Sequence, residues 1–231
     1  MHVLGIVPAR GGSKGIPGKN LVPILGRPLL AWTAAAALAS TRLTRAILST
    51  DDDAIAEAGL ACGLEVPFMR LPALAGDETP MIDVLRHAVA RLEEAEAYRP
   101  DILVLLQPTS PLRRAEHIDA AVDLLMSTGA DSVVSVVEVP HQFNPVSVMR
   151  MESGRLVPYG EGPPAPRRQD KPRVYGRNGP AVLALRTACL EEHGRLYGPD
   201  TRPLIMTAED SIDIDSPWEI ALVSWMLARR S

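Results

Sequence analysis

Residues 3–20 read VLGIVPARGGSKGIPGKN, and this stretch decides the fold that the sequence predicts. The apolar run from Val3 to Val7 is typical of a short strand buried inside a parallel sheet. A loop that contains four glycines and three cations begins at Pro8. Glycine-rich backbone can turn successive N–H groups toward one anion, and open α/β sheets bind nucleotides where the first strand ends. The stretch therefore predicts an α/β protein with a doubly wound, mainly parallel sheet and a phosphate-binding loop.

The loop does not match the standard phosphate-binding motifs. A P-loop needs a glycine where Ser13 stands, and a Ser or Thr where Asn20 stands. The dinucleotide fingerprint G-x-G-x-x-G is absent as well. Residues 10–20 instead resemble the signature of the acylneuraminate cytidylyltransferases, which make CMP-activated sialic acids and related nonulosonic acids. A basic Gly/Pro surface turn is the alternative interpretation.

This resemblance implies a Rossmann-like nucleotidyltransferase fold and a reaction between CTP and a nonulosonic acid that releases pyrophosphate. It implies that Arg10, Lys14 and Lys19 are catalytic residues that hold the triphosphate. Arg70 matches a family arginine that reaches the cytosine ring, and a salt-bridged surface arginine is the alternative. The residues that the resemblance assigns to CTP are Ala9, Arg10, Gly12, Ser13, Lys14, Lys19, Asn20 and Arg70.

Composition describes an ordinary globular chain. Of the 231 residues, 46% are apolar and 23% are charged, which suits one domain spanning residues 1–231. A net charge of −4 and few aromatic residues argue against a nucleic-acid surface. Cys62 and Cys189 have no CxxC or His partner, so we expect them to be reduced in a cytoplasmic protein. Residues 2–7 form too short a stretch for a signal peptide or a membrane span.

Hydrophobic periodicity predicts the remaining elements. Three aspartates, 51–53, follow the strand expected at 46–50, and we expect them mainly to cap the next helix, although one of them can face the nucleotide. Further strands are expected at 65–69, 101–106 and 132–139. Helices are expected at 29–38, 54–62, 81–94, 115–126 and after 216.

A second signature, QPTSPLR at residues 107–113, follows the strand at 101–106. Its polar side chains stand at a carboxyl strand end, where ligands bind in this architecture, and its two prolines stiffen the turn. The resemblance implies that Gln107 contacts the sugar acid. Arg113 is a secondary candidate, with helix capping as the alternative.

Residues 140–174 contain seven prolines and show no sustained hydrophobic periodicity. A segment of this length is too long for an ordinary loop inside a compact domain. The resemblance implies a dimerisation arm that covers the active site of a second subunit, and hence a homodimer. A disordered loop is the alternative. Arg168 and Asn178 match positions at the sugar end, and Asn178 opens a turn before an expected edge strand. Two departures from the sialic acid enzymes, Asn144 and Val182, are expected where the sugar is read, so the substrate need not be N-acetylneuraminic acid.

Residues 210–219 read DSIDIDSPWE and form the last signature. Extended residues two apart point to one side, so Asp213 and Asp215 present their carboxylates together. Such a pair suits Mg²⁺, which prefers one or two carboxylates plus phosphate oxygens and water. Ser216 to Glu219 predict a capping box with proline at the first helical position. We therefore expect Asp213 and Asp215 to be metal ligands and catalytic residues; a helix-start role is the alternative, best suited to Asp215.

The implied chemistry is an in-line attack of the sugar's anomeric hydroxyl on the α-phosphorus of CTP. No general base stands out, since His141 is in the arm and His87 is on a helix. A Kdo-type cytidylyltransferase shares the fold but lacks the Gly-Gly-Ser-Lys-Gly run. A nicotinamide oxidoreductase is disfavoured by the missing fingerprint, and a non-catalytic nucleotide-binding protein is the remaining alternative. The sequence leaves open which nonulosonic acid is used.

Overall fold

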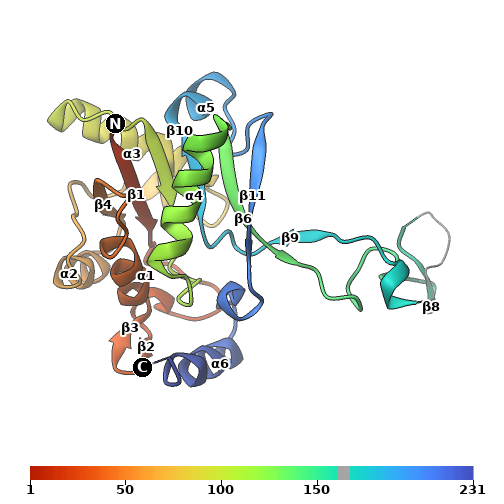
Figure 1. Cartoon of the computed structure of the whole chain (residues 1–231). Coiled ribbons are helices and arrows are strands. Elements are labelled where there is room, and N and C mark those ends of the chain that lie inside the picture. Colours follow the sequence, from red (N-terminus) through yellow and green to blue (C-terminus); the bar gives the residue numbers. More distant parts are fainter. Residues whose placement is uncertain (161–166, 231) are drawn as a thin grey trace.

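The computed structural model describes residues 1–160 and 167–230, and a seven-stranded sheet lies at its centre (Figure 1). The strand order is β11-β6-β10-β5-β1-β4, with β9 added beside β6. Strands β4, β1, β5, β6 and β11 share one direction, whereas β10 and β9 oppose it. The sheet is thus mixed and mainly parallel, as predicted. The strands are β1 Val3–Pro8, β4 Arg45–Ser49, β5 Ile102–Leu105, β6 Ser132–Glu138, β9 Tyr175–Arg177, β10 Leu183–Arg186 and β11 Thr201–Met206.

Helices cover both faces of this sheet. Buried residues of α1, α2 and α4 pack on one face, and those of α3 and α5 pack on the other. A third cluster joins α6 to Ile16 of the glycine-rich loop and to Ile214 of the last signature. The helices are α1 Leu29–Leu38, α2 Asp53–Ala61, α3 Met81–Glu96, α4 Ala115–Thr128, α5 Thr187–Glu192 and α6 Pro217–Leu227.

Strand β1 shows why unbroken apolar runs in the sequence predict central strands. Val3 and Val7 belong to the cluster on the α1 face, whereas Leu4 and Ile6 belong to the cluster on the α3 face. Successive side chains of a strand point to opposite faces, so a strand covered on both sides must be apolar throughout. All six residues of β1 are buried.

Two expected strands differ from the structure. Residues 65–69 form no strand; Glu65 makes a single bridge to Ile47, and Pro67 has no N–H group to continue a ladder. The strand after Asn178, expected at an edge, is β10, and it lies inside the sheet between β5 and β6. The antiparallel insertion of β10 depends on pairing between distant segments, which local patterning does not encode.

The segment 140–174 leaves the sheet after β6 and returns as β9, and Figure 1 shows it reaching away from the body of the molecule. It contains a hairpin of β7 (Met149–Glu152) and β8 (Arg155–Pro158) and a 3₁₀ turn, η3 (Arg168–Asp170). Residues 161–166 of the expected arm lie outside the described residues. Among the helices that the structure describes, none has the length and apolar character needed to cross a membrane.

Candidate functional site

The candidate site is a cleft of about 360 Å³ at the carboxyl ends of β1 and β5. After β1, the chain adds β4 on one side and β5 on the other, which makes this edge a topological switch point, the usual ligand position in such sheets. Of the residues predicted to contact CTP or the sugar, seven line it. These are Arg10, Ser13, Lys14, Lys19, Asn20, Arg70 and Gln107.

The backbone of the glycine-rich loop is held by buried and half-buried polar neighbours. Asn20 is 7% exposed and its Nδ2 donates to the carbonyl of Arg10 at 3.0 Å. Gly11 N donates to Asp51 Oδ1 at 3.1 Å. A Cβ on Gly11 would lie 2.7 Å from Asp52 Oδ2, so a larger residue here would displace the side chain that caps α2. The loop is therefore shaped before a ligand arrives, and both Asp51 and Asp52 lie against it at Gly11.

Two other residues of the predicted CTP set take different places. Ala9 is buried, and its N–H donates to the carbonyl of Ser49 at 3.0 Å, so it continues the sheet pairing rather than lining the cleft. Gly12 is exposed at the tip of the loop. Asp52 caps α2, since its Oδ1 accepts from Ile55 N at 2.9 Å, as the capping interpretation expects.

Asp77 is a residue that sequence reasoning did not single out. Its carboxylate pairs with Arg10 Nη2 at 2.5 Å and with Lys14 Nζ at 2.7 Å. The Lys14 ammonium and the Arg10 guanidinium hold the pKa of Asp77 below its usual range. The Asp77 carboxylate thus pairs with the two cations that are expected to hold phosphates. Its only sequence signal was one carboxylate in the loop after Arg70, a pattern that fits many surface loops.

Arg70 is buried, which removes the surface salt-bridge interpretation. It is 5% exposed, and it donates to Ser49 Oγ at 3.1 Å and to the Ser49 carbonyl at 2.5 Å. Burial lowers the pKa of Arg70 from its ordinary value. The negative charge of Asp51 opposes this fall in the pKa only in part, and a buried guanidinium that faces a cleft is suited to an electron-rich ligand.

The carboxylate pair lies beside the second signature. Asp213 Oδ1 accepts from Ser110 Oγ at 3.0 Å, and Ile214 N donates to the carbonyl of Thr109 at 2.8 Å. Burial raises the pKa of Asp213, and the negative charge of Asp215 adds to this rise. The Asp215 side chain is 80% exposed. The capping box of Ser216 and Glu219 starts α6 directly after the pair, as predicted.

A divalent cation fits this arrangement. Asp213 is a half-buried carboxylate whose charged form is disfavoured where it lies, and a cation would offset that cost. Among the described residues no group of three or more His, Cys, Asp or Glu side chains could enclose a metal. Two carboxylates would thus leave the remaining positions to phosphate oxygens and water, the ligand set that Mg²⁺ prefers.

Arg113 is a structural arginine rather than a helix cap. It is 3% exposed, and its guanidinium donates to the carbonyls of Gln107 and Ala181 and to Thr33 Oγ1. Burial lowers the pKa of Arg113 to about 9. The residue before α4 is Arg114. Arg113 therefore locks the turn that carries Gln107 and Ser110.

Three positions expected at the sugar end lie elsewhere. Asn178 is 6% exposed, and its amide bonds to Ser135 Oγ and Ser211 Oγ, so it fixes a turn and does not line the cleft. Val182 is fully buried in the core, where it cannot contact a ligand. Asn144 is also buried, where its Nδ2 donates to the carbonyl of Pro172 inside the arm. The corrections to Asn178 and Val182 share one cause, since they lie just before β10 and their side chains face the interior, whereas Asn144 is held within the arm.

Arg168 is not brought together with Gln107 within one chain. It is exposed on η3 and lines a second hollow of about 530 Å³, formed within the arm. Lys171 beside it donates to the carbonyl of His141 and to Ser147 Oγ, which braces the arm.

Comparisons with known proteins agree with this geometry. A family model described as cytidylyltransferase matches residues 4–161. The chain is 34% identical to the CMP-N,N'-diacetyllegionaminic acid synthase of Legionella pneumophila, covering 98% of this chain and 97% of that protein. It is also 34% identical to N-acylneuraminate cytidylyltransferase A of Danio rerio over 95% of this chain, but it spans only 50% of that longer protein. A solved CMP:2-keto-3-deoxy-manno-octonic acid synthetase complexed with CTP aligns with a TM-score of 0.73 at 20% identity over 100% of both chains, which supports the fold alone.

Proposed function

The chain belongs to the cytidylyltransferase family, and from this premise we propose that it couples CTP to a nonulosonic acid, giving the CMP-sugar and pyrophosphate. One observation carries the proposal. The loop signature, Arg70 and Gln107 converge on a single cleft, in a chain that matches a legionaminic acid synthase over nearly its full length.

The cations of the loop suit the triphosphate. Arg10 and Lys14 face the cleft, and their present partner is the exchangeable carboxylate of Asp77. Lys19 Nζ lies at the junction between the loop and the last signature, where phosphate and metal would meet. In-line attack by the sugar's anomeric hydroxyl forms the new P–O bond as the bond to pyrophosphate breaks. The protein's task is then to orient the reactants and to neutralise charge.

Asp213 and Asp215 are the residues that would hold Mg²⁺ in this proposal. When bound, the cation would offset phosphate charge and lower the pKa of the attacking hydroxyl. Ser110 and the Thr109 carbonyl hold the segment in place from one side, and Lys19 holds it from the other.

Arg70 supports the choice of base. Its burial places a fixed guanidinium in the cleft, 3.1 Å from Ser49 Oγ, where it can donate to a cytosine carbonyl without first losing side-chain freedom. We therefore propose that CTP is preferred over UTP, ATP and GTP.

The sugar end of the site is proposed to form between two copies of the chain. Gln107 lines the cleft, whereas Arg168 lies out on the arm. A homodimer in which each arm covers the other cleft would bring them together. The arm carries the exposed apolar side chains that such packing would bury: Phe143, Val146, Met149, Met151, Leu156 and Tyr159.

We also propose a cytoplasmic location, with small molecules rather than nucleic acid or membrane as partners. Both cysteines, Cys62 and Cys189, are unpaired, which suits a reducing compartment.

The deciding experiment is a pyrophosphate-release screen with CTP, Mg²⁺ and a panel of neuraminic, legionaminic, pseudaminic and Kdo acids. Release with a nonulosonic acid supports the proposal and identifies the substrate, and turnover with Kdo alone would favour the Kdo-type alternative. Binding of CTP without release on any acid would indicate a non-catalytic nucleotide-binding protein. UTP, ATP and GTP in place of CTP are the controls for the base.

A further inference from the structure

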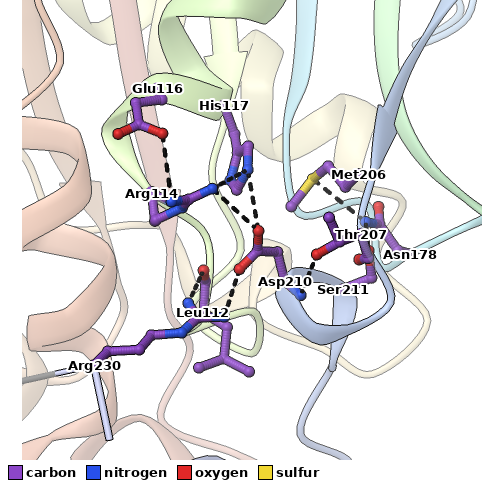
Figure 2. Close-up of polar contacts among 10 residues, drawn as sticks. All are labelled: Leu112, Arg114, Glu116, His117, Asn178, Met206, Thr207, Asp210, Ser211 and Arg230. Carbon is purple, nitrogen blue, oxygen red and sulfur yellow. Dashed lines mark hydrogen bonds and ion pairs between the residues drawn. The ribbon is translucent and has the colours of Figure 1, made fainter. Parts of the chain in front are cut away.

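Asp210 is a buried carboxylate at which three segments of the chain meet, as Figure 2 shows. Its side chain is 6% exposed. Arg230 Nη2, past the end of α6, lies 2.5 Å from Oδ1. Arg114 Nη2 and His117 Nε2, from the start of α4, lie 3.3 and 3.5 Å from Oδ2. The N–H of Asp210 itself donates to Thr207 Oγ1 at 3.2 Å.

His117 contributes as a neutral donor. The backbone N–H of Arg114 donates to His117 Nδ1 at 3.1 Å, so this nitrogen is the acceptor and Nε2 carries the proton that faces Asp210. Burial lowers the pKa of His117, which keeps the ring neutral near pH 7. The two arginines therefore supply the charges that balance Asp210.

The cluster also holds the two signatures that flank the cleft. Arg230 Nη1 donates to the carbonyl of Leu112 at 3.1 Å, in the turn that carries Ser110. On the other side, Ser211 Oγ donates to the carbonyl of Thr207 and accepts from Asn178 Nδ2 (Figure 2). Asp210 thus anchors the start of the segment that carries Asp213 and Asp215.

Stability alone is a poor reason for such a cluster. Buried ion pairs often stabilise a fold no better than apolar side chains of the same size would, because desolvation offsets the attraction. A carboxylate held by several donors has a defined position, however, and positions the backbone that carries it.

We propose that Asp210 is a positioning residue that holds Asp213 and Asp215 in the geometry needed to bind the metal. The inference rests on the proposed function for the metal itself. Asp210 acts through the backbone of residues 211–215 and touches neither substrate nor metal. Its partners Arg230 and Arg114 share this role.

The test compares Asp210→Asn and Arg230→Ala with two matched controls. Asp119→Asn changes a different carboxylate with several hydrogen bonds, which lies on α4 and accepts from Ser40, Thr41 and Arg42 away from the cleft. Arg229→Ala changes the neighbouring arginine, which stacks on Trp225. Three quantities are measured: the melting temperature, deuterium uptake of residues 211–216 without metal or nucleotide, and the Mg²⁺ concentration that gives half-maximal pyrophosphate release.

We expect Asp210→Asn and Arg230→Ala to speed deuterium uptake in this segment and to raise the half-saturating Mg²⁺ concentration by about tenfold or more. The CTP KM at saturating Mg²⁺ should stay near that of the wild type. Asp119→Asn should lower the melting temperature without moving the other two readouts, and Arg229→Ala should move none of them.

The positioning role is wrong if Asp210→Asn and Arg230→Ala lower only the melting temperature and leave deuterium uptake and the Mg²⁺ requirement unchanged. It is also wrong if Asp119→Asn raises the Mg²⁺ requirement as much as they do. If Asp210→Asn does not fold, Arg230→Ala still tests the role, because the Arg230 side chain is 33% exposed at the end of α6. A wild-type protein that releases no pyrophosphate would refute the proposed function, while deuterium uptake would still decide whether Asp210 orders the segment.

Discussion

The Nζ atom of Lys19 lies 3.4 Å from Oδ1 of Asp215, although the two residues are 196 positions apart in sequence. The same ammonium donates to the carbonyl of Ile214 at 2.7 Å. The Lys19 side chain is only 14% exposed, whereas that of Asp215 is 80% exposed, so the contact with the Ile214 carbonyl is the more sheltered of the two. Lys19 therefore joins the glycine-rich loop to the segment that carries the candidate metal ligands.

The carboxylate pair is tested by Asp213→Asn and Asp215→Asn. Each change keeps the size of the side chain and removes the charge, so folding should survive while metal binding is lost. Metal stabilisation of a developing phosphate charge contributes several kcal/mol, so kcat should fall by roughly a hundredfold or more. The exposed Asp53, in the first turn of α2, gives the control variant Asp53→Asn. Near-normal turnover of both variants in excess chelator would make the pair structural.

Lys19→Met should affect nucleotide and metal together. It removes the ammonium that lies on the Ile214 carbonyl, so steady-state kinetics should show a higher CTP KM and a higher Mg²⁺ requirement. Lys14→Met is the matched comparison, because Lys14 is 79% exposed and its ion pair is with Asp77. It should raise the CTP KM alone. An unchanged Mg²⁺ requirement in Lys19→Met would separate the loop from the metal segment.

Asp77→Asn should strengthen CTP binding. The carboxylate competes with the triphosphate for Arg10 and Lys14, and an exposed pair of this kind is weak, so a two- to fivefold lower Kd by calorimetry is a rough expectation. Glu78→Gln, the neighbouring exposed acid, is the control. Weaker binding by Asp77→Asn would show instead that Asp77 orients the two cations.

Arg168→Ala should raise the KM for the sugar acid and leave that for CTP nearly unchanged. Losing a charge-assisted hydrogen bond costs about 1.5–3 kcal/mol, or roughly 10- to 100-fold. If the arm acts on a second subunit, mixing and refolding Arg168→Ala with Asp213→Asn should restore part of the activity, because some sites then receive both intact residues. No recovery on mixing would place Arg168 and the carboxylates in the same subunit's site, and a change in CTP KM alone would move Arg168 to the phosphates.

His87→Phe should stabilise the protein, and more so in acid. Both imidazole nitrogens are buried without a hydrogen-bond partner among the described residues, and the ring packs edge-on against Phe68. Removing an unpaired buried polar group should raise the free energy of unfolding by about 1 kcal/mol near pH 7.

The pH dependence of this gain follows from burial, which lowers the pKa of His87, with the positive charges of Arg91 and Arg70 adding to the effect. The unfolded chain then takes up a proton at higher pH than the folded one, so wild-type stability is full above the unfolded value of about 6.5 and falls below it. The melting-temperature advantage of His87→Phe should grow from pH 7 to pH 5. An advantage that shrinks in acid would mean that the ring is charged in the folded protein.

Local patterns in the sequence determined most of the central elements, although they did not indicate α5 or β11. The unbroken apolar runs of β1 and β5 require cover on both faces, which specifies a doubly wound sheet without knowledge of any contact. The capping box at Ser216 fixes where α6 begins for the same reason, since its partners lie within one turn. The loop at 10–20 carries its glycines and cations within one short stretch directly after β1, so its place at the end of that strand follows from the sequence.

Tertiary structure alone decided which distant groups meet. Nothing near Lys19, Asp77 or Arg113 in the sequence indicates that they would contact Asp215, Arg10 and the Ala181 carbonyl. Their partners lie in other segments, and periodicity and capping report only on neighbours within a few residues. The insertion of β10 against the direction of the parallel strands turned Asn178 and Val182 into the core, because a residue's orientation in a sheet depends on which strands pair beside it.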